Sequence, residues 1–520
     1  MKLHPHTFKA SLTTALGILA LSWLPNAQAQ TSTWDGGAAN NNWTSAANWV
    51  GDTAPVSGTS TVLLFTGSNR LTPFADASYN ISRIEFLAGA SSFDLVGSGT
   101  LSPFSINGTT TAAIVNNSSV LQTISAPMAF TTSNLSYTFN AAAGDLQINS
   151  NIAASNNRLI LTGSAGRTVT MNGTLSGAGS AVASLVLNTA NLNLVMKNAN
   201  TYTGQTFISR GTAYVQTNNA FGAGSTIQLA QNTTPTDAAS ILIDGAYSVG
   251  QNIILNKTVA TGTATTTLGG SSAHDSSFTG TITMGSTGTF GRALTVTAAN
   301  GGKVTFSGNI LTSGTDNSDS ITKIGQGTVV FSGSNTYKGI TQINAGTLLV
   351  NGSHSGGGAY TVASTATLGG TGTITEVVNI NSGGFLLAGT GTAASGTLTI
   401  AGNTTFADGS TIELTLGASG VHSTLARSSG TWTFDSDQAF NFINQGATAG
   451  FYDNIITGLA GDPGVGSWTI ANAGWVGTFA YDGSNNVDLT LSAVPEPTSV
   501  ALFVASLGFA VFFRKRTRQA

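Results

Sequence analysis

The feature that most constrains this chain of 520 residues is an internal repeat. Residues 200–215 and 335–350 are identical at nine of sixteen positions, at a constant offset of 135. Tyr, Ile and Val match in register, not only the abundant Thr and Gly, so the two segments form a genuine repeat. A shorter period lies nearby, because Val329, Leu348, Leu368 and Leu387 recur at nearly constant intervals. We therefore expect a structure wound in coils of about twenty residues.

The local pattern between the two chain ends predicts strands and turns. Short β-rich runs such as residues 328–331 and 341–343 alternate with Gly, Asn and Ser, and no long 3.6-residue periodicity appears in residues 30–493. Strands that recur at a fixed period without intervening helices are best closed into a parallel β-helix. The four residues Val329, Leu348, Leu368 and Leu387 would then form one core column. With about 4.8 Å between coils, the body would hold at most roughly 23 coils and reach about 110 Å.

The second copy of the repeat resembles a known family of repeats. Residues 322–348, which begin Thr-Lys-Ile-Gly-Gln-Gly-Thr, look like the autotransporter-associated β-strand repeat. The resemblance is strong over residues 321–352 and recognisable over 191–216, and residues 366–372 and 396–400 are similar to the segments that trail such repeats. It implies a right-handed β-helix of the passenger type. Autotransporters end in a long outer-membrane barrel, whereas this chain ends in an apolar segment and a basic tail, so we do not expect self-translocation.

The N-terminus has the pattern of a secretory signal peptide. Lys2 and Lys9 precede an apolar run over residues 12–24, and Ala27-Gln28-Ala29 follows. Cleavage is expected after Ala29, because a small residue stands at both ends of this tripeptide. The apolar run is too short for a comfortable membrane span, which argues against a retained anchor.

The C-terminus has three parts in order: Val494-Pro495-Glu496-Pro497, an apolar stretch over 498–513, and a basic tail that begins Arg514-Lys515-Arg516. The apolar stretch predicts a short transmembrane helix of roughly 24 Å, and the basic tail should stay cytoplasmic. This tail resembles the PEP-CTERM sorting signal, which implies cleavage near the Pro-Glu-Pro motif by an exosortase-type enzyme and transfer to the cell envelope. An ordinary single-pass anchor is the alternative.

These signals divide the chain into five parts. We expect a signal peptide at 1–29, an N-terminal cap and β-solenoid at 30–190, a β-helix with the repeats at 191–420, a C-terminal β cap at 421–493, and the sorting signal with its membrane anchor at 494–518. Trp34, Trp43 and Trp49 are expected to cap the first coil, because the end of a solenoid exposes core and strand edges. Stacking on sugar rings is the alternative role of this aromatic cluster.

Composition excludes several classes of partner. Residues 30–493 carry 12 basic and 20 acidic side chains, a net charge of −8, which disfavours nucleic acid and anionic lipid. Only 8% of all residues are charged, so the surface should be rich in hydroxyl and amide groups. The chain has no Cys, which excludes disulfides, thiolate metal sites and a cysteine nucleophile.

The histidines of the body do not form a recognisable metal motif. His274, His354 and His422 each lie in a Gly- or Ser-rich neighbourhood without recurring ligand spacing, so we expect surface turns, no metal and no cofactor. HExxH, GxSxG and phosphate-loop motifs are missing from the sequence.

Paired carboxylates leave one enzymatic alternative open, a secreted β-helix polysaccharide lyase or glycosidase. Glycoside cleavage needs two carboxylates at a set separation. The candidate pairs are Asp435 with Asp437, Asp316 with Asp319, and Asp408 with Glu413. Asp435 and Asp437 would lie on one face of a strand, but their pattern also fits an exposed turn or a calcium-binding rim, and no catalytic residue is predicted.

The sequence thus favours an exported structural or adhesive protein of a Gram-negative envelope. We expect it to be anchored in the inner membrane by its C-terminal helix before transfer to the cell surface or the biofilm matrix. The expected partners are an exosortase-type enzyme and extracellular polysaccharide.

Overall fold

The computed structural model describes residues 30–103, 112–130, 135–178, 184–223, 226–230, 237–256, 265–285, 292–313 and 319–494. Within these residues the protein consists of β-strands, turns and three short 3-10 helices, η1 (Ala46–Asn48), η2 (Ala418–Gly420) and η3 (Val465–Ser467). In this part of the chain no helix is long and apolar enough to cross a membrane. The predicted signal peptide and the predicted transmembrane helix at 498–513 lie outside the described residues.

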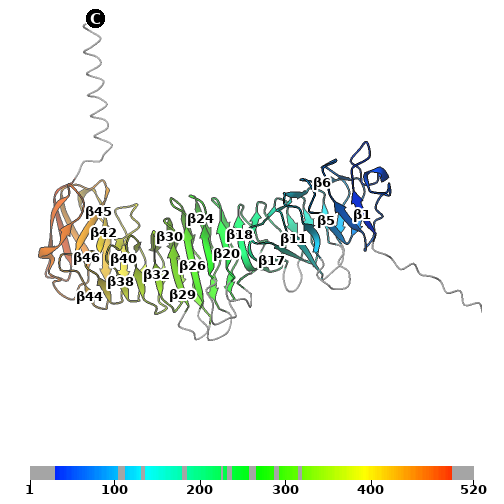
Figure 1. The fold of residues 1–520 in the computed structure, drawn as a ribbon. Coiled ribbons are helices and arrows are strands. Elements are labelled where there is room, and N and C mark those ends of the chain that lie inside the picture. Colours follow the sequence, from blue (N-terminus) through cyan, green and yellow to red (C-terminus); the bar gives the residue numbers. More distant parts are fainter. Residues whose placement is uncertain are drawn as a thin grey trace, which may run out of the picture.

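The strands stack side by side along a rod, from β1 (Thr31–Trp34) at one end to the antiparallel strands near residue 490 at the other (Figure 1). Strands of successive coils pair in parallel, and among the described residues the sheets contain 26, 10, 8 and 5 strands. This arrangement agrees with the predicted all-β solenoid. Its right-handed winding stays a prediction.

The ten-stranded and eight-stranded sheets carry most of the residues discussed below. The ten-stranded sheet contains β21 (Ser248–Val249), β24 (Asp275–Phe278), β27 (Lys303–Phe306), β30 (Thr328–Phe331), β33 (Thr347–Val350), β36 (Thr367–Gly370), β39 (Phe385–Ala388), β42 (Thr411–Gly417), β45 (Ala439–Gln445) and β47 (Thr469–Ile470). The eight-stranded sheet contains β31 (Ser334–Asn335), β34 (Ser353–His354), β37 (Thr373–Ile374), β40 (Thr397–Ile400), β43 (Thr424–Arg427), β46 (Gly450–Thr457), β49 (Val487–Ala493) and β48 (Val476–Tyr481).

Coil length varies along the rod. One of the shortest steps between paired residues joins Tyr360 of β35 (Tyr360–Val362) to Val378 of β38 (Val378–Ile380). One of the longest is the first pairing, in which Thr31 of β1 lies beside Val62 of β2 (Val62–Phe65). The expected period of about twenty therefore describes the coils around the second repeat and underestimates most others.

The predicted core column is correct for three of its four members. Val329, Leu348 and Leu368 are consecutive partners in the ladder, and each side chain is fully buried. The next partner is Leu386, so the prediction of Leu387 is wrong. The coil from Leu368 is one residue shorter than the leucine spacing suggests, and a slip of one residue turns a strand side chain to the opposite face. Leu387 accordingly lies on the outer face of the sheet.

Glycine at a corner allows neighbouring coils to approach closely. Gly346 has a φ of +61°, and a Cβ atom there would lie 2.5 Å from the carbonyl oxygen of Gly325 in the preceding coil. A side chain at this position would be both strained and obstructed. This glycine, which the first repeat copy shares as Gly211, therefore has a packing reason in the second copy.

The two repeat copies form the same buried hydrogen bond. The hydroxyl of Tyr202 lies 2.7 Å from that of Thr206, and the hydroxyl of Tyr337 lies 2.6 Å from that of Thr341. Both tyrosines and both threonines are fully buried. The hydroxyl pairs therefore satisfy each other inside the core, as buried polar groups require.

The repeated asparagines bind backbone in the preceding coil. Asn200 Oδ1 accepts a hydrogen bond of 2.6 Å from the amide of Leu175, and Asn335 Oδ1 accepts one of 2.9 Å from the amide of Ile310. Both side chains are almost completely buried. Their role is therefore structural, because they join neighbouring coils through the backbone.

The aromatic cluster at the N-terminal end is closed. Trp34, Trp43 and Trp49 are fully buried and surround Phe65, and Trp49 Nε1 donates to the carbonyl of Trp43 at 2.8 Å. Their rings therefore offer no free face on which a sugar could stack.

The C-terminal end changes from parallel to antiparallel pairing. The last parallel pair joins β45 to β47, while β49 pairs antiparallel with both β46 and β48. Phe440 and Phe479 pack together there with ring centroids 4.4 Å apart. Parallel coils thus continue into the segment 421–493, and the antiparallel strands cover the end of the stack.

Candidate functional site

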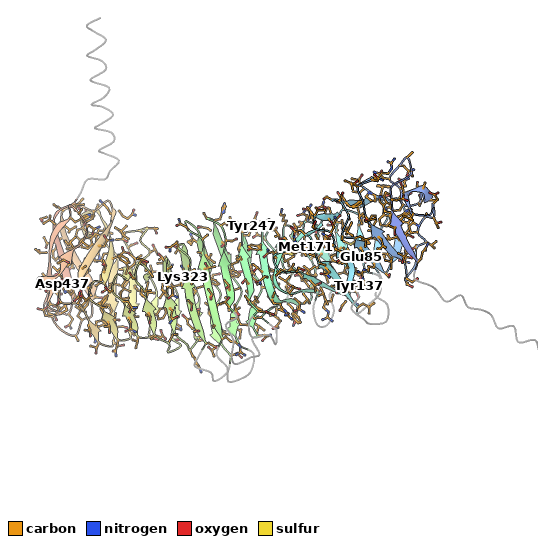
Figure 2. The ribbon with its side chains drawn as sticks, viewed as in Figure 1. Glu85, Tyr137, Met171, Tyr247, Lys323 and Asp437 are labelled. Carbon is orange, nitrogen blue, oxygen red and sulfur yellow. The ribbon has the colours of Figure 1, made fainter. Side chains whose placement is uncertain are left out.

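Three carboxylates from the predicted pairs meet at one place on the rod. Asp408 lies in the turn before β42, and Asp435 and Asp437 lie in the turn before β45. Because Thr411 pairs with Ala439, the two turns are neighbours in consecutive coils. One oxygen from each of the three aspartates lies within 4.8 Å of the others. Figure 2 places Asp437 near the C-terminal end of the rod.

This aspartate cluster has the donor atoms of a hard-cation site, because converging carboxylate oxygens are typical calcium ligands. Asp408 and Asp437 are exposed, and exposed acidic groups are common without an ion. We therefore assign no function to the cluster.

The predicted pairing of Asp408 with Glu413 is not formed in the structure, and that of Asp316 with Asp319 stays a prediction. Glu413 lies on β42, where its Oε1 accepts a hydrogen bond of 2.7 Å from Asn441 Nδ2. Burial raises the pKa of Glu413, and this hydrogen bond partly offsets the effect. Asp319 is buried and accepts hydrogen bonds from the amide of Arg292 and the hydroxyl of Thr312. Its predicted partner, Asp316, lies outside the described residues.

The three histidines occupy different environments. His274 is exposed in a bend, as predicted. His422 is partly buried, and its Nε2 lies 2.7 Å from the carbonyl of Asp453. His354 is fully buried, so its assignment to a surface turn is wrong. The physical reason is its place on β34, where it pairs with the buried Asn335 of the preceding coil.

His354 is the centre of a buried polar cluster. Its ring stacks on Tyr337 with centroids 4.0 Å apart, and its Nε2 lies 2.9 Å from the carbonyl of the same residue. Its Nδ1 lies 2.9 Å from the hydroxyl of Tyr360 and 3.3 Å from Oε2 of Glu376. Side chains from three successive coils are thus joined through one imidazole.

Burial determines the protonation of this cluster. It lowers the pKa of His354 despite the opposing effect of the Glu376 carboxylate, and it raises the pKa of Tyr337 and of Tyr360. The imidazole is therefore neutral at pH 7. Because a carbonyl can only accept, Nε2 carries the proton and donates to Tyr337, and Nδ1 accepts from the hydroxyl of Tyr360.

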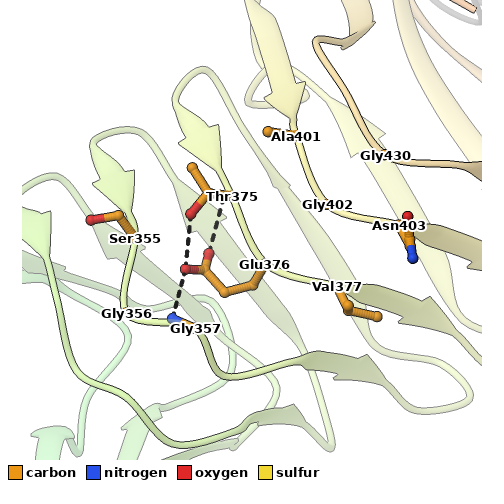
Figure 3. Close-up of a pocket in the computed structure, with 10 residues that line it drawn as sticks. All are labelled: Ser355, Gly356, Gly357, Thr375, Glu376, Val377, Ala401, Gly402, Asn403 and Gly430. Atoms are coloured by element: carbon orange, nitrogen blue, oxygen red, sulfur yellow. Dashed lines mark hydrogen bonds between the residues drawn. The ribbon is translucent and has the colours of Figure 1, made fainter.

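Glu376 forms one wall of a shallow hollow of about 360 Å³, which Figure 3 shows in close-up. Its Oε1 accepts hydrogen bonds of 3.0 Å from the amide of Gly357 and the hydroxyl of Thr375, and its Oε2 accepts one of 3.0 Å from the amide of Thr375. The side chain is only 1% exposed. A carboxylate held by so many donors is positioned to join coils, and it presents little of itself to a ligand.

The His354–Glu376 pair was not predicted from the sequence. A usable signal was present, because His354 follows the repeat residue Asn335 by one coil of this region. The pairing of His354 with Asn335 in this register would have predicted that the His354 side chain points into the core. Glu376 carried no comparable signal, since its turn lies outside the repeat.

Comparison with known families supports the interpretation of the repeat. The model of the passenger-associated-transport-repeat matches residues 193–212 and 321–350. The chain carries two passenger repeats. This confirms the predicted autotransporter-associated repeats over these segments, and it indicates a secreted, autotransporter-like passenger protein that reaches the cell surface. No curated protein matches the chain.

The residues predicted to direct processing are almost all outside the described part of the chain. These are Ala27 and Ala29 at the signal cleavage site, and Pro495, Glu496, Pro497, Arg514, Lys515 and Arg516 in the tail. Val494, the last described residue, is partly buried against the core. The sorting signal and its membrane anchor stay predictions.

Proposed function

We propose that this protein is an exported structural or adhesive component of a Gram-negative cell envelope. It is sorted by an exosortase-type enzyme and associates with extracellular polysaccharide or biofilm matrix. The observation that carries the proposal is the pair of passenger repeats within one continuous rod of stacked coils. A rod that is tethered at one end extends away from the membrane. Its sides are then free to contact the surroundings.

The surface chemistry agrees with a matrix role. The outward positions of the long sheet form a column in which Thr267, Thr295 and Thr322 are consecutive partners, followed by Gln342 and Thr361. Such side chains both donate and accept hydrogen bonds, as sugar hydroxyls do. The low charge of the chain also limits repulsion between neighbouring molecules in a matrix.

Replacing Pro495, Glu496 and Pro497 by Ala tests the sorting part of the proposal in the native host. The apolar stretch and the basic tail remain, so membrane insertion should persist. The variant should accumulate uncut in the inner membrane, while the parent reaches the surface. Deletion of residues 498–520 is the matched control and should yield a soluble exported body. Normal processing and display of the Ala variant would leave only a plain membrane anchor.

A further inference from the structure

A second apolar cluster lies on the outer face of the ten-stranded sheet, separate from the core. It contains Val330, Leu349 and Leu387, whose side chains are 5%, 6% and 4% exposed, with Ile443 packed against them. Val330 pairs with Leu349, Leu349 with Gly369, and Gly369 with Leu387, so the cluster is one outward column. Outward strand positions in a soluble stalk are normally polar, so this column requires an explanation.

A glycine lets the column close into a continuous floor. A Cβ atom on Gly369 would lie 2.9 Å from the Cβ of Leu387 and 3.2 Å from Cδ2 of Leu349. Because glycine has no Cβ atom, Leu349 and Leu387 can flank Gly369 in the ladder, and both leucines are almost completely buried. The floor is therefore aliphatic, and only a narrow strip of it is accessible.

The floor lies in a groove of about 590 Å³. Thr328, Thr347 and Thr367 form a hydroxyl ladder along one side, since they are consecutive partners. The segment 390–392 forms a lip, and Gly391 lies against the side chains of Leu387 and Ile443. The volume falls within the range of about 300 to 1,000 Å³ that is typical of ligand sites, and ten of the fifteen lining residues are polar or charged.

Few charged side chains surround the groove. The lining contains one Lys and one Glu, Lys303 and Glu413. Lys303 forms an ion pair with Asp275, with 2.5 Å between Nζ and Oδ2. Glu413 follows Leu387 in the outward column, and its Oε1 accepts from Asn441. Because Asp275 pairs with Lys303, the lining offers no unpaired positive charge to an anionic ligand, and the exported body as a whole is acidic.

We propose that this groove binds a neutral oligosaccharide segment of an extracellular polysaccharide. The inference rests on the proposed matrix function and identifies its contact site. Ring hydroxyls bond to the threonine ladder, Glu413 Oε2 accepts a further hydroxyl, and the C–H face of a ring covers the small part of Leu349 and Leu387 that remains accessible. A sugar chain suits the site better than a peptide. An extended peptide binds by pairing with an open sheet edge, whereas this groove lies on the face of a sheet.

Affinity electrophoresis of the purified full-length protein tests the site, with hydroxyethylcellulose, dextran or galactomannan in the gel and alginate as the acidic comparator. Thr347→Lys fills the groove, and Thr392→Lys blocks it from the exposed lip without touching the ladder. The matched control is Thr361→Lys, an equally half-buried outward threonine on β35 that does not line the groove.

We expect at least one neutral polysaccharide to retard the parent and the Thr361→Lys variant equally. Both groove variants should lose at least tenfold in affinity at an unchanged melting temperature, and alginate should retard the protein less. Failure of every neutral polysaccharide, a preference for alginate, or undiminished binding by Thr392→Lys would each overturn the groove assignment. Normal surface display together with any of these results would leave the envelope function standing without this site.

Discussion

The two passenger repeats have the same buried tyrosine but different surroundings. In the first copy Tyr202 bonds to Thr206. In the second, Tyr337 bonds to Thr341 and also meets Tyr360, with 3.3 Å between the hydroxyls. The tyrosine–threonine pair is thus the common structural unit of the repeat, and the second copy has joined it to a larger network.

Coil regularity differs in the same way. After the second copy the ladder passes from Thr341 to Tyr360 and on to Val378, in two short steps of nearly equal length. After the first copy it passes from Thr206 to Ile227 and on to Ile253, and both of these steps are longer and unequal. Short coils of nearly equal length allow side chains to form hydrogen bonds across several successive coils.

The largest effect should come from a charge in the regular column of the second copy. Leu348→Asp places a carboxylate between Val329 and Leu368, and we expect a loss of about 4 kcal/mol or more in the free energy of unfolding. Thr347→Ser, the outward neighbour, should cost no more than about 0.5 kcal/mol. Equal small losses for both variants in thermal or denaturant unfolding would contradict the register.

An intermediate loss of stability should distinguish the two repeat tyrosines. Tyr337→Phe removes a hydroxyl that meets both Thr341 and Tyr360, so we expect a loss of about 2 kcal/mol. Tyr202→Phe leaves the buried hydroxyl of Thr206 without this partner and should cost about 1 kcal/mol. Denaturant titration of both variants measures the difference. A larger loss for Tyr202→Phe would remove the distinction between the copies.

These contacts explain how far the sequence could predict the fold. Val329, Leu348 and Leu368 were correctly placed because each follows a threonine at a nearly constant interval. Leu387 was misplaced because the following coil is one residue shorter, and a change of one residue reverses the face of a strand. A single sequence does not show directly that a coil is one residue shorter, because the difference lies in the length of a turn and not in the pattern of a strand.

The candidate sites were harder to predict for the same reason. Asp408 meets Asp435 and Asp437 only because the intervening coil has the length that brings Thr411 beside Ala439. The glycines and serines around His354 resemble a turn, although its register with Asn335 places it in the core. Contacts across coils depend on coil length, which varies along the described part of the rod.

A smaller effect should appear in the pH dependence of stability. Burial lowers the pKa of His354, so between that lowered value and about 6.5 the unfolded chain binds a proton that the folded chain does not. The free energy of unfolding that the neutral His354 contributes is fully present above about pH 6.5. It falls as the pH decreases, by at most about 1.4 kcal/mol per pH unit. His354→Asn, which copies Asn335, should flatten this slope in melting experiments from pH 7.5 to 5. His274→Asn, at an exposed position, should not; an unchanged slope in His354→Asn would refute the assignment.

No catalytic effect is expected from the aspartate cluster. Asp435→Asn and Asp437→Asn should leave both display and polysaccharide binding unchanged, and the parent should release no reducing sugar from a panel of polysaccharides. Sugar release by the parent that either substitution abolishes would instead favour a secreted carbohydrate-active enzyme.

Mass spectrometry of the surface-displayed protein from its native host tests the central proposal most directly, because it determines both processed ends at once. We predict an N-terminus at Gln30 and a C-terminus within or next to Pro495-Glu496-Pro497. A displayed protein that still ends at Ala520 would contradict sorting by cleavage, and a protein that retains Met1 and stays inside the cell would contradict export of the stalk itself.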